Sequence, residues 1–369
     1  MVGVGLLCAM LPLAGCSGLG NQPSPDTRTA APRTTSPTTT SPTAAGPTSV
    51  SQDVTPQASE LLTGLTSPWG LVALKDGTLL ISERDTGKIL RADGSATKLL
   101  RTVEDTAPSA EGGLLGLAIT ADERRVFAYY TGAEDNRIVA MSWNGRSLGE
   151  PEVILDGISK AGVHDGGRMV VGPDGHLYVG TGDAAESERA QDKSSLSGKI
   201  LRVTVNGQPA PGNPFGNEVF SLGHRNVQGL TFDEEDRLWA SEFGRQDWDE
   251  LNLIEKGKNY GWPRVEGSGE GDGLTNPKVV WKTEEASPSG LAYWQGHLWM
   301  AGLRGERLWQ IPVDGTDTGD PVAHFQGEYG RLRTVVVSND GQSLLMTTSN
   351  TDGRGDVQDG DDRLLQIRR

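Results

Sequence analysis

Residues 166–182, GGRMVVGPDGHLYVGTG, read as two short strands joined by a tight turn. Apolar side chains lie on both sides of Pro-Asp-Gly, and an Asp-Gly pair between such runs is typical of a β-hairpin. The same order of small start, apolar strand, turn and second apolar strand recurs along the chain. Its six copies begin at Trp69, Leu115, Gly166, Gln228, Ser289 and Leu332.

The spacing of these copies predicts the fold. They start about 45 to 60 residues apart, a period that is typical of propeller blades with several strands each. A third apolar strand follows several copies, as in GKILRA from Gly87 and GKILRV from Gly198. We therefore predict an all-β protein with a six-bladed β-propeller over residues 58–369. Seven or eight blades are an alternative if one copy has diverged, whereas no sustained 3.6-residue periodicity supports an α/β fold.

The N-terminus predicts export. Residues 2–15, VGVGLLCAMLPLAG, are apolar and Cys16 follows them directly, although no Lys or Arg precedes the stretch. The stretch is too short to span a membrane, and its end, Leu-Ala-Gly-Cys, resembles the bacterial lipoprotein signal. We predict a lipoprotein signal over residues 1–15 with the lipid on Cys16; the alternative is an apolar N-terminal strand. The protein would then be an extracytoplasmic, cell-surface or periplasmic-type lipoprotein, held at the cytoplasmic membrane only by this anchor.

Residues 16–57 predict a disordered tether between the anchor and the propeller. The stretch 23–49 is rich in Thr, Ser and Pro and contains no Ile, Leu, Val, Met or aromatic residue. Such a segment cannot bury enough apolar surface to offset the conformational entropy lost on ordering. Part of the low overall hydrophobic fraction, 35% of 369 residues, comes from this segment.

Charge and cysteine content exclude several classes of protein. The chain has 34 Lys and Arg against 49 Asp and Glu, for a net charge of −15, which argues against a nucleic-acid-binding protein because these present a basic surface. Its 2 cysteines exclude a disulfide scaffold and a Cys-rich zinc site. Past the N-terminus, no stretch is long and apolar enough to span a membrane. We expect function to lie in the loops at one end of the central channel.

Two histidines occupy matching positions in neighbouring repeats. His164 precedes the innermost strand of the third copy, in AGVHDGGRMVV, and His224 precedes that of the fourth, in SLGHRNVQGL. We expect both rings to face the same mouth of the channel. Because imidazole exchanges protons near neutral pH, the pair marks a candidate catalytic site.

Long segments around these histidines resemble the soluble glucose/sorbosone dehydrogenase family, quinoprotein sugar dehydrogenases that use pyrroloquinoline quinone (PQQ), and within it the bacterial aldose sugar dehydrogenase branch. The similarity spans nearly all of residues 58–369. It implies a six-bladed propeller and oxidation of an aldose to its lactone, with hydride transfer to the quinone and electrons passed to an unknown external acceptor. The segments that carry it are SPWGL, EGGLLGLA, HDGGRMVVGPDGHLYVGTGD, AQDKSSLSGKILRV, NPFGNEVFSLGHRNVQGL, DELNLIEKGKNYGWP, SPSGLAYW and GRLRTVVVSNDG.

The resemblance implies a role for three residues in the chemical step. His164 matches the catalytic base, which takes the proton from the anomeric hydroxyl. Arg225 and Asn226, in GHRN, match the pair that binds the cofactor beside its reactive carbonyls. A guanidinium there stabilises the negative charge that develops as hydride adds, so Arg225 is also a candidate catalytic residue.

Three further arginines match positions that bind the cofactor. Arg331 and Arg333, in GRLRT, match two arginines that bind its carboxylates. Alternation along a strand places both on one face, and a guanidinium suits bidentate carboxylate binding. Arg304, in AGLRGERL, stands where the family often has a Lys near the cofactor, and the two side chains are not equivalent.

The resemblance also implies calcium, which prefers oxygen ligands. In this branch one calcium is bound by a Glu and by the carbonyl of a Tyr ten residues later, and Glu250 and Tyr260 reproduce that spacing. A second calcium binds the quinone through backbone carbonyls of a loop that corresponds here to SEFGRQDWD from Ser241, whose ligands the sequence does not identify. The acidic run 352–362, DGRGDVQDGDD, lacks EF-hand spacing, so we predict a solvated loop.

Two positions near the expected sugar site depart from the glucose-oxidising members. Some of these have an Asp directly before the catalytic His, where this chain has Val163, and a Gln where it has Glu111. Glu111 is therefore a candidate contact for a small-molecule aldose, and glucose itself is not predicted. Two other functions stay open: a metal-dependent propeller lactonase, disfavoured because arginines repel a metal, and a non-catalytic sugar- or ligand-binding surface propeller.

Overall fold

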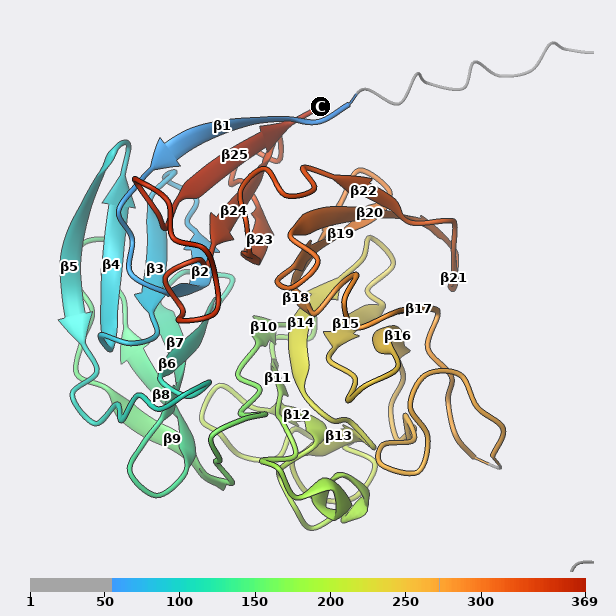
Figure 1. Ribbon diagram of the computed structural model, residues 1–369. Helices are drawn as coiled ribbons and strands as arrows, with labels where there is room; N and C mark the ends of the chain where they lie inside the picture. The colour runs from blue at the N-terminus through green and yellow to red at the C-terminus, as the bar shows by residue number, and fades with distance from the viewer. Residues whose placement is uncertain (1–54, 272) are drawn as a thin grey trace, which may run out of the picture. The chain divides into compact units, whose positions relative to one another are not determined.

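A computed structural model describes residues 55–271 and 273–369, which form six antiparallel sheets around a central axis (Figure 1). The predicted six-bladed β-propeller is confirmed. The predicted lipoprotein signal, Cys16 and the tether up to residue 54 lie outside the described residues. In the part of the chain that the structure describes, no helix is long and apolar enough to cross a membrane.

Each of the first three blades has four strands that follow one another from the axis outward. The third strands predicted after Gly87 and Gly198 are β4 and β12. Blade one is β2 (Pro68–Ala73), β3 (Leu79–Glu83), β4 (Lys88–Asp93) and β5 (Ala96–Thr102); blade two is β6 (Leu114–Ile119), β7 (Arg125–Thr131), β8 (Asn136–Ser142) and β9 (Glu152–Ile158); blade three is β10 (Met169–Val171), β11 (Leu177–Gly180), β12 (Lys199–Val203) and β13 (Val219–Leu222).

Blade three also contains a short 3₁₀ helix, η1 (Ser187–Gln191), in its long loop. The last three blades repeat the four-stranded arrangement, except that two short strands both pair with β20 at the edge of blade five. Blade four is β14 (Val227–Phe232), β15 (Leu238–Glu242), β16 (Asp249–Ile254) and β17 (Val279–Trp281); blade five is β18 (Pro288–Trp294), β19 (His297–Gly302), β20 (Arg307–Asp314), β21 (Asp317–Thr318) and β22 (Val322–His324); blade six contains β23 (Leu332–Val337), β24 (Leu344–Thr348) and β25 (Leu364–Arg368).

The ring closes between the two ends of the propeller. β1 (Gln57–Leu62) pairs antiparallel with β25 and becomes the outermost strand of blade six, where Ala58 lies opposite Ile367 (Figure 1). The first blade is thereby joined to the last through backbone hydrogen bonds. The repeat pattern does not include β1, because its sequence, QASELL, has only two clearly apolar positions at its end and no hairpin turn beside it.

Glycines in the repeat allow the innermost strands to approach closely. The second residue of WGL, LGL, QGL and SGL lies where a side chain would point at the next blade. A Cβ on Gly116 would lie 2.1 Å from the carbonyl oxygen of Gly167, and one on Gly290 would lie 2.7 Å from Cα of Thr334. Only glycine fits such an approach without moving a strand.

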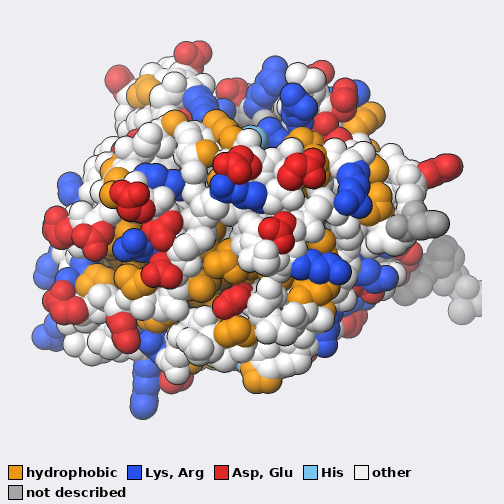
Figure 2. Space-filling model, turned by 90° about the horizontal axis from the view of Figure 1, so that it is seen from below, with side chains coloured by type: hydrophobic (Ala, Val, Ile, Leu, Met, Phe, Trp, Pro, Cys, Tyr) orange, Lys and Arg blue, Asp and Glu red, His pale blue; other side chains and the backbone are white. Residues whose placement is uncertain are grey.

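Large apolar side chains fill the spaces between neighbouring blades. Phe127 and Tyr129 of blade two are fully buried in one cluster with Leu201 and Val203 of blade three. Outside this core, the rim seen in Figure 2 carries interspersed acidic and basic side chains. The inter-blade packing holds the loops at the channel end in fixed relative positions, and the site described next is built from those loops.

Candidate active site

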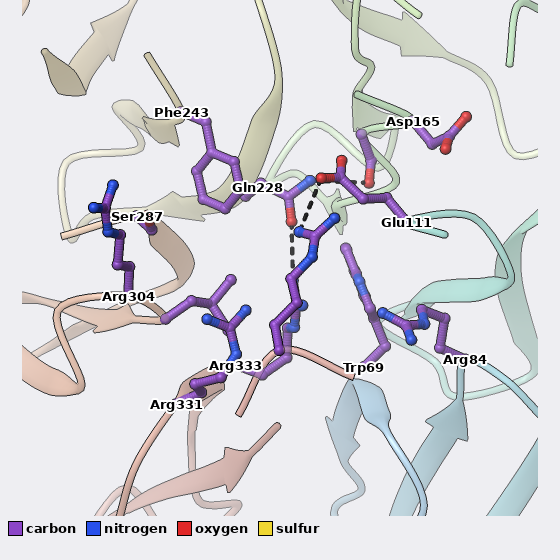
Figure 3. A pocket seen from close by; sticks show the side chains of 13 residues that line it. Trp69, Arg84, Glu111, Asp165, Gln228, Phe243, Ser287, Arg304, Arg331 and Arg333 are labelled. Carbon is purple, nitrogen blue, oxygen red and sulfur yellow. Dashed lines mark hydrogen bonds and ion pairs between the residues drawn. The ribbon is translucent and has the colours of Figure 1, made fainter. Parts of the chain in front are cut away.

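A cavity of about 330 Å³ lies at the end of the channel where the innermost strands begin, a size within the range of small-molecule sites. Arg304, Arg331 and Arg333 reach toward it from one side, and Glu111 and Asp165 lie at the other (Figure 3). Its lining residues are Trp69, Arg84, Glu111, Asp165, Gly166, Gln228, Phe243, Ser287, Leu303, Arg304, Arg331, Arg333 and Arg354.

Arg331 and Arg333 lie together in the cavity wall, as their spacing in the sequence predicts. Both are buried and both contact one carboxylate oxygen of Asp352, at 3.0 Å and 3.4 Å. Burial alone raises the pKa of Asp352, but the charges of Arg333 and Arg331 outweigh it and hold that pKa below its usual value. The two cations share one counter-ion, so the pair keeps an excess of positive charge.

The prediction of a solvated loop over residues 352–362 is wrong at both ends of the run. Asp352 is the buried partner of two arginines, and Asp362 is fully buried and accepts a hydrogen bond from the Thr348 hydroxyl at 2.9 Å. Only the middle of the run, such as Asp356, is exposed. The spacing of acidic residues does not reveal whether a carboxylate folds back onto cations of another loop.

Arg333 also contacts the floor of the cavity. Its Nη1 donates to Oε1 of Gln228 at 3.3 Å, and its guanidinium lies 5.7 Å from the Trp69 ring. Burial lowers the pKa of Arg333 to about 10, with a smaller effect from Arg331 and Arg84. Its Nε is buried with no hydrogen-bond partner among the described residues. Arg304 lines the same cavity but is exposed.

His164 directly precedes Asp165 and Gly166, which line this cavity, and it has partners on both ring nitrogens. Nδ1 lies 2.7 Å from Oδ1 of Asp183, and Nε2 lies 2.8 Å from Nη2 of Arg225. A carboxylate only accepts and a guanidinium only donates, so Nδ1 carries the proton and Nε2 keeps its lone pair. His164 has a φ of 61°, in the left-handed region that non-glycine residues seldom adopt.

Asp183 fixes this ring orientation. Its second oxygen, Oδ2, accepts a hydrogen bond from the Trp262 indole at 2.8 Å, and the carboxylate is buried. Burial alone raises the pKa of Asp183, but the hydrogen bonds from His164 and Trp262 outweigh it, so the pKa lies below its usual value. An ionised Asp183 is therefore available as the acceptor for Nδ1–H.

Asn226 adjoins the cavity through Gly166 and Gln228, and Arg225 adjoins it through the backbone of Phe243. Nη1 of Arg225 donates to the carbonyl of Gly244 at 2.5 Å, and burial lowers its pKa. Oδ1 of Asn226 accepts from the backbone N–H of Gly166 at 3.1 Å and from Nε2 of Gln228 at 3.2 Å. Nε of Arg225 and Nδ2 of Asn226 are buried donors without partners among the residues described.

Glu111 links His164 to the last blade. One oxygen accepts a hydrogen bond from the backbone N–H of His164 at 2.8 Å, and the other pairs with Nη1 of Arg354 at 3.0 Å. Glu111 lines the cavity, which is consistent with its expected place near a sugar. Both of its oxygens are already engaged, so its most direct effect is on the position of His164.

His224 does not face the channel mouth, contrary to the prediction. Its ring is fully buried, held by Oε2 of Glu242 and Oγ of Ser221 at 2.8 Å each, and stacked on Tyr260 at 4.8 Å. Both histidines lie at the same end of their blades, but their positions in the repeat differ by one residue. His164 lies four residues before Arg168, whereas His224 lies five residues before Gly229, so Arg225 takes the place of His164 in blade four.

The structure brings Glu250 and Tyr260 to one small cavity of about 10 Å³, together with Glu242 and Glu266. Glu250 is buried; burial and then the charge of Glu242 raise its pKa to about 8. Oδ1 of Asn252, next to it, is a buried acceptor without a partner in the described range. No cluster of three or more His, Cys, Asp or Glu side chains arranged to hold a metal occurs among the described residues. A calcium ion at this cavity stays a prediction.

Several site residues were missed in the sequence. Asp183 ends the segment TGD, which follows β11 directly. A polar residue just after a blade strand could have marked Asp183 as a site residue. Asp352 and Arg354 were missed because their partners lie in other loops. Trp69 and Gln228 occupy the position just before the repeat glycine, and that shared position was a second usable signal.

Comparison with known proteins identifies the relatives of this chain. The family model described as Glucose / Sorbosone dehydrogenase matches residues 65–358. The chain belongs to this family. It is 52% identical to the PQQ-bound aldose sugar dehydrogenase of Streptomyces coelicolor, whose structure matches with a TM-score of 0.82 over 85% of this chain and 98% of that one.

Other members of the family match over similar lengths. A structure from Thermus thermophilus, a putative oxidoreductase (glucose dehydrogenase), is 42% identical with a TM-score of 0.80, over 85% of this chain and 99% of that one. Among curated proteins, the aldose sugar dehydrogenase YliI of Escherichia coli is 27% identical, over 78% of this chain and 88% of that protein. Sugar oxidation is thus the activity that recurs in the names of the relatives.

Proposed function

We propose that this chain is a PQQ- and calcium-dependent aldose dehydrogenase that oxidises the anomeric carbon of a sugar to a lactone and passes electrons to an external acceptor. The observation that carries the proposal is the arrangement Asp183, His164 and Arg225, with contacts of 2.7 Å and 2.8 Å, beside an arginine-lined cavity. The relationship to the PQQ-bound aldose sugar dehydrogenase of Streptomyces coelicolor supports it.

The residues present fit a flat polyanionic cofactor. Arg331 and Arg333 share a single counter-ion, and Nε of Arg333 and Nδ2 of Asn226 are buried donors without partners in the described part of the chain. A buried donor is costly unless it finds an acceptor. Carboxylate and carbonyl oxygens of PQQ would supply such acceptors. Arg331, Arg333 and Arg304 would hold the carboxylates, and Arg225 and Asn226 the reactive carbonyls.

The chemistry of this chain follows from the tautomer of His164. The anomeric hydroxyl replaces Arg225 as the hydrogen-bond donor to Nε2 of His164. Nε2 then accepts the proton of that hydroxyl. Asp183 stabilises the imidazolium that results, because its carboxylate already accepts from Nδ1–H. When bound, PQQ would supply the acceptor for the hydride from the anomeric carbon. Arg225, released from Nε2, is placed to stabilise the negative charge that arrives with the hydride.

Calcium is proposed at the cavity of Glu250 and Tyr260. Glu242, Glu266 and one cation, Arg225, also line it. The carboxylates outnumber the arginine there, and a divalent cation would offset the excess negative charge. Calorimetric titration of the cofactor-free protein with calcium tests this. Glu250→Gln should abolish the high-affinity isotherm, and Glu255→Gln, an exposed change near the same strand, should not. An unchanged isotherm in Glu250→Gln would place the ion elsewhere.

Reconstitution tests the main proposal. The chain is loaded with PQQ and calcium, and reduction of a redox dye is followed with a panel of aldoses. We expect turnover with at least one aldose, and His164→Ala should bind PQQ but lose at least about 100-fold in kcat. His297→Ala, in a hairpin turn away from the cavity, is the matched control. Absence of PQQ binding at micromolar cofactor would refute the proposal and favour a binding propeller.

We also propose that the protein is a lipoprotein anchored through Cys16 at the outer face of the cytoplasmic membrane. The support is the sequence pattern of residues 1–15 followed by Cys16 and the Thr/Ser/Pro-rich segment. After metabolic labelling with a radioactive fatty acid, the protein should carry the label and be recovered in the membrane fraction. Cys16→Ser should abolish both the label and the membrane association. An unlabelled wild-type protein in the wash fraction would contradict the anchor.

A further inference from the structure

Arg168 breaks the glycine pattern of the innermost strands. The position that is Gly70, Gly116, Gly229 and Gly290 in four blades is Arg168 in blade three and Thr334 in blade six. These two blades face each other across the ring, and Nη2 of Arg168 donates to the hydroxyl of Thr334 at 3.1 Å. The arginine side chain therefore crosses the axis of the channel.

Arg168 lies directly behind the candidate active site. Its Nε donates to the backbone carbonyl of Gln228 at 2.7 Å, and its guanidinium carbon lies 4.2 Å from the centre of the Trp69 ring. Gln228 and Trp69 line the active-site cavity, whereas Arg168 lines a second cavity of about 300 Å³ formed by the inner strands of all six blades. The side chain thus separates the two cavities and supports the floor of the first.

Among the described residues, no carboxylate pairs with Arg168. The residue is only 7% exposed, and its hydrogen-bond partners there are a backbone carbonyl and a hydroxyl. Burial, and then the charge of Arg333, lower the pKa of Arg168 to about 9, so the guanidinium stays charged at neutral pH. Four arginines of the cavity, in contrast, have carboxylate partners: Arg331 and Arg333 share Asp352, Arg84 has Asp85 and Arg354 has Glu111.

We propose that Arg168 is a positioning residue that holds an uncompensated positive charge beneath the cofactor and thereby favours its reduced form over its oxidised form. The inference rests on the proposed function. Hydride transfer would add one unit of negative charge to the cofactor itself, while the hydroxyl proton goes to His164. A fixed, buried cation stabilises that added charge more than it stabilises the oxidised state. The glycine found at this position in four blades could not do so.

The test measures affinity and potential rather than turnover. The full chain is loaded with PQQ and calcium, and the dissociation constants of oxidised and reduced PQQ are measured by tryptophan fluorescence, with the two-electron potential from equilibration with redox dyes. Arg168→Met keeps the length of the side chain and removes its charge. We expect reduced PQQ to be weakened about tenfold more than oxidised PQQ, which equals a fall of about 30 mV for a two-electron couple.

Matched variants separate charge from packing. Arg168→Lys keeps the charge and should retain most of the wild-type potential, and Arg146→Met, an exposed change, should leave it unchanged. If Arg168→Met does not fold, Arg168→Gln is the second neutral variant. Equal weakening of both PQQ forms, or the same potential shift in Arg168→Lys as in Arg168→Met, would show a purely structural role. A wild-type chain that binds no PQQ would instead overturn the proposed function itself.

Discussion

Nε2 of His164 accepts a hydrogen bond from Nη2 of Arg225 at 2.8 Å, although the two residues lie 61 positions apart in the chain. Once Nε2 takes a proton, it can no longer accept from a guanidinium, and two cations face each other. Proton uptake by His164 must therefore release Arg225. The base and the cation that stabilises arriving charge are coupled by this one contact.

Asp183→Asn should impair the base without removing it. The amide can donate to Nδ1 and so favours the tautomer with the proton on Nε2, the atom that must accept from the sugar. We expect kcat to fall about 100-fold or more with little change in KM. Steady-state kinetics on the PQQ-loaded enzyme measures this. Asp192→Asn, exposed in the same loop, is the control, and equal losses in both variants would contradict the assignment.

Asp352→Asn should lower the free energy of unfolding. The loss should be smaller when PQQ is bound than when it is absent. Two buried guanidinium groups lose their shared carboxylate, and breaking a buried ion pair from one side costs about 3–5 kcal/mol. A bound polyanion would restore part of that loss. Urea unfolding with and without PQQ measures both effects. Asp356→Asn, exposed in the same loop, should change neither, and a stable Asp352→Asn protein would argue against the shared counter-ion.

Gly116→Ala should distort the contact between blades two and three. The added Cβ would lie 2.1 Å from the carbonyl oxygen of Gly167, so a strand must shift, at a cost of about 1–3 kcal/mol or more. The free energy of unfolding in urea gives the value. Gly162→Ala, where the nearest atom is 4.0 Å away, is the matched change and should have a small effect. Similar values for both variants would contradict a packing role.

Asp165 should make stability depend on pH in a mildly acidic window. Burial, followed by the charge of Glu111, raises the pKa of Asp165 from 3.8 to about 6. Between these values the folded chain holds a proton that the unfolded chain has released, so stability falls as pH rises from about 4 to about 6 and then levels off. Asp165→Asn should reduce the slope of this part of the profile in urea unfolding series, and Asp249, whose pKa burial also raises to about 6, contributes the slope that stays. A profile as steep as that of the wild type would assign the titration to another group.

The blades were predictable because their signals are local. An Asp-Gly turn between alternating apolar runs specifies a hairpin without help from the rest of the chain, and the six repeats confirm each other. β1 was not predictable in this way, because its partner β25 lies at the other end of the chain and its own sequence has no turn beside it. Long-range pairing leaves little trace in a short segment.

His164 and His224 show the same limit at the level of side chains. His164 lies four residues before Arg168, whereas His224 lies five residues before Gly229, the equivalent position of the next blade, and His224 is fully buried. Each ring binds a carboxylate through Nδ1, Asp183 or Glu242, that the sequence around the histidine does not reveal.

The sequence by itself determined the number of blades and, through its resemblance to a family, which residue types meet at the channel end. Only the tertiary structure decided which charges neutralise one another: Asp352 with Arg331 and Arg333, Asp183 with His164, and none with Arg168 among the described residues. The reason is physical. Turns and strand periodicity depend on neighbours in the chain, whereas charge pairing depends on distances across the ring that only the packed blades set.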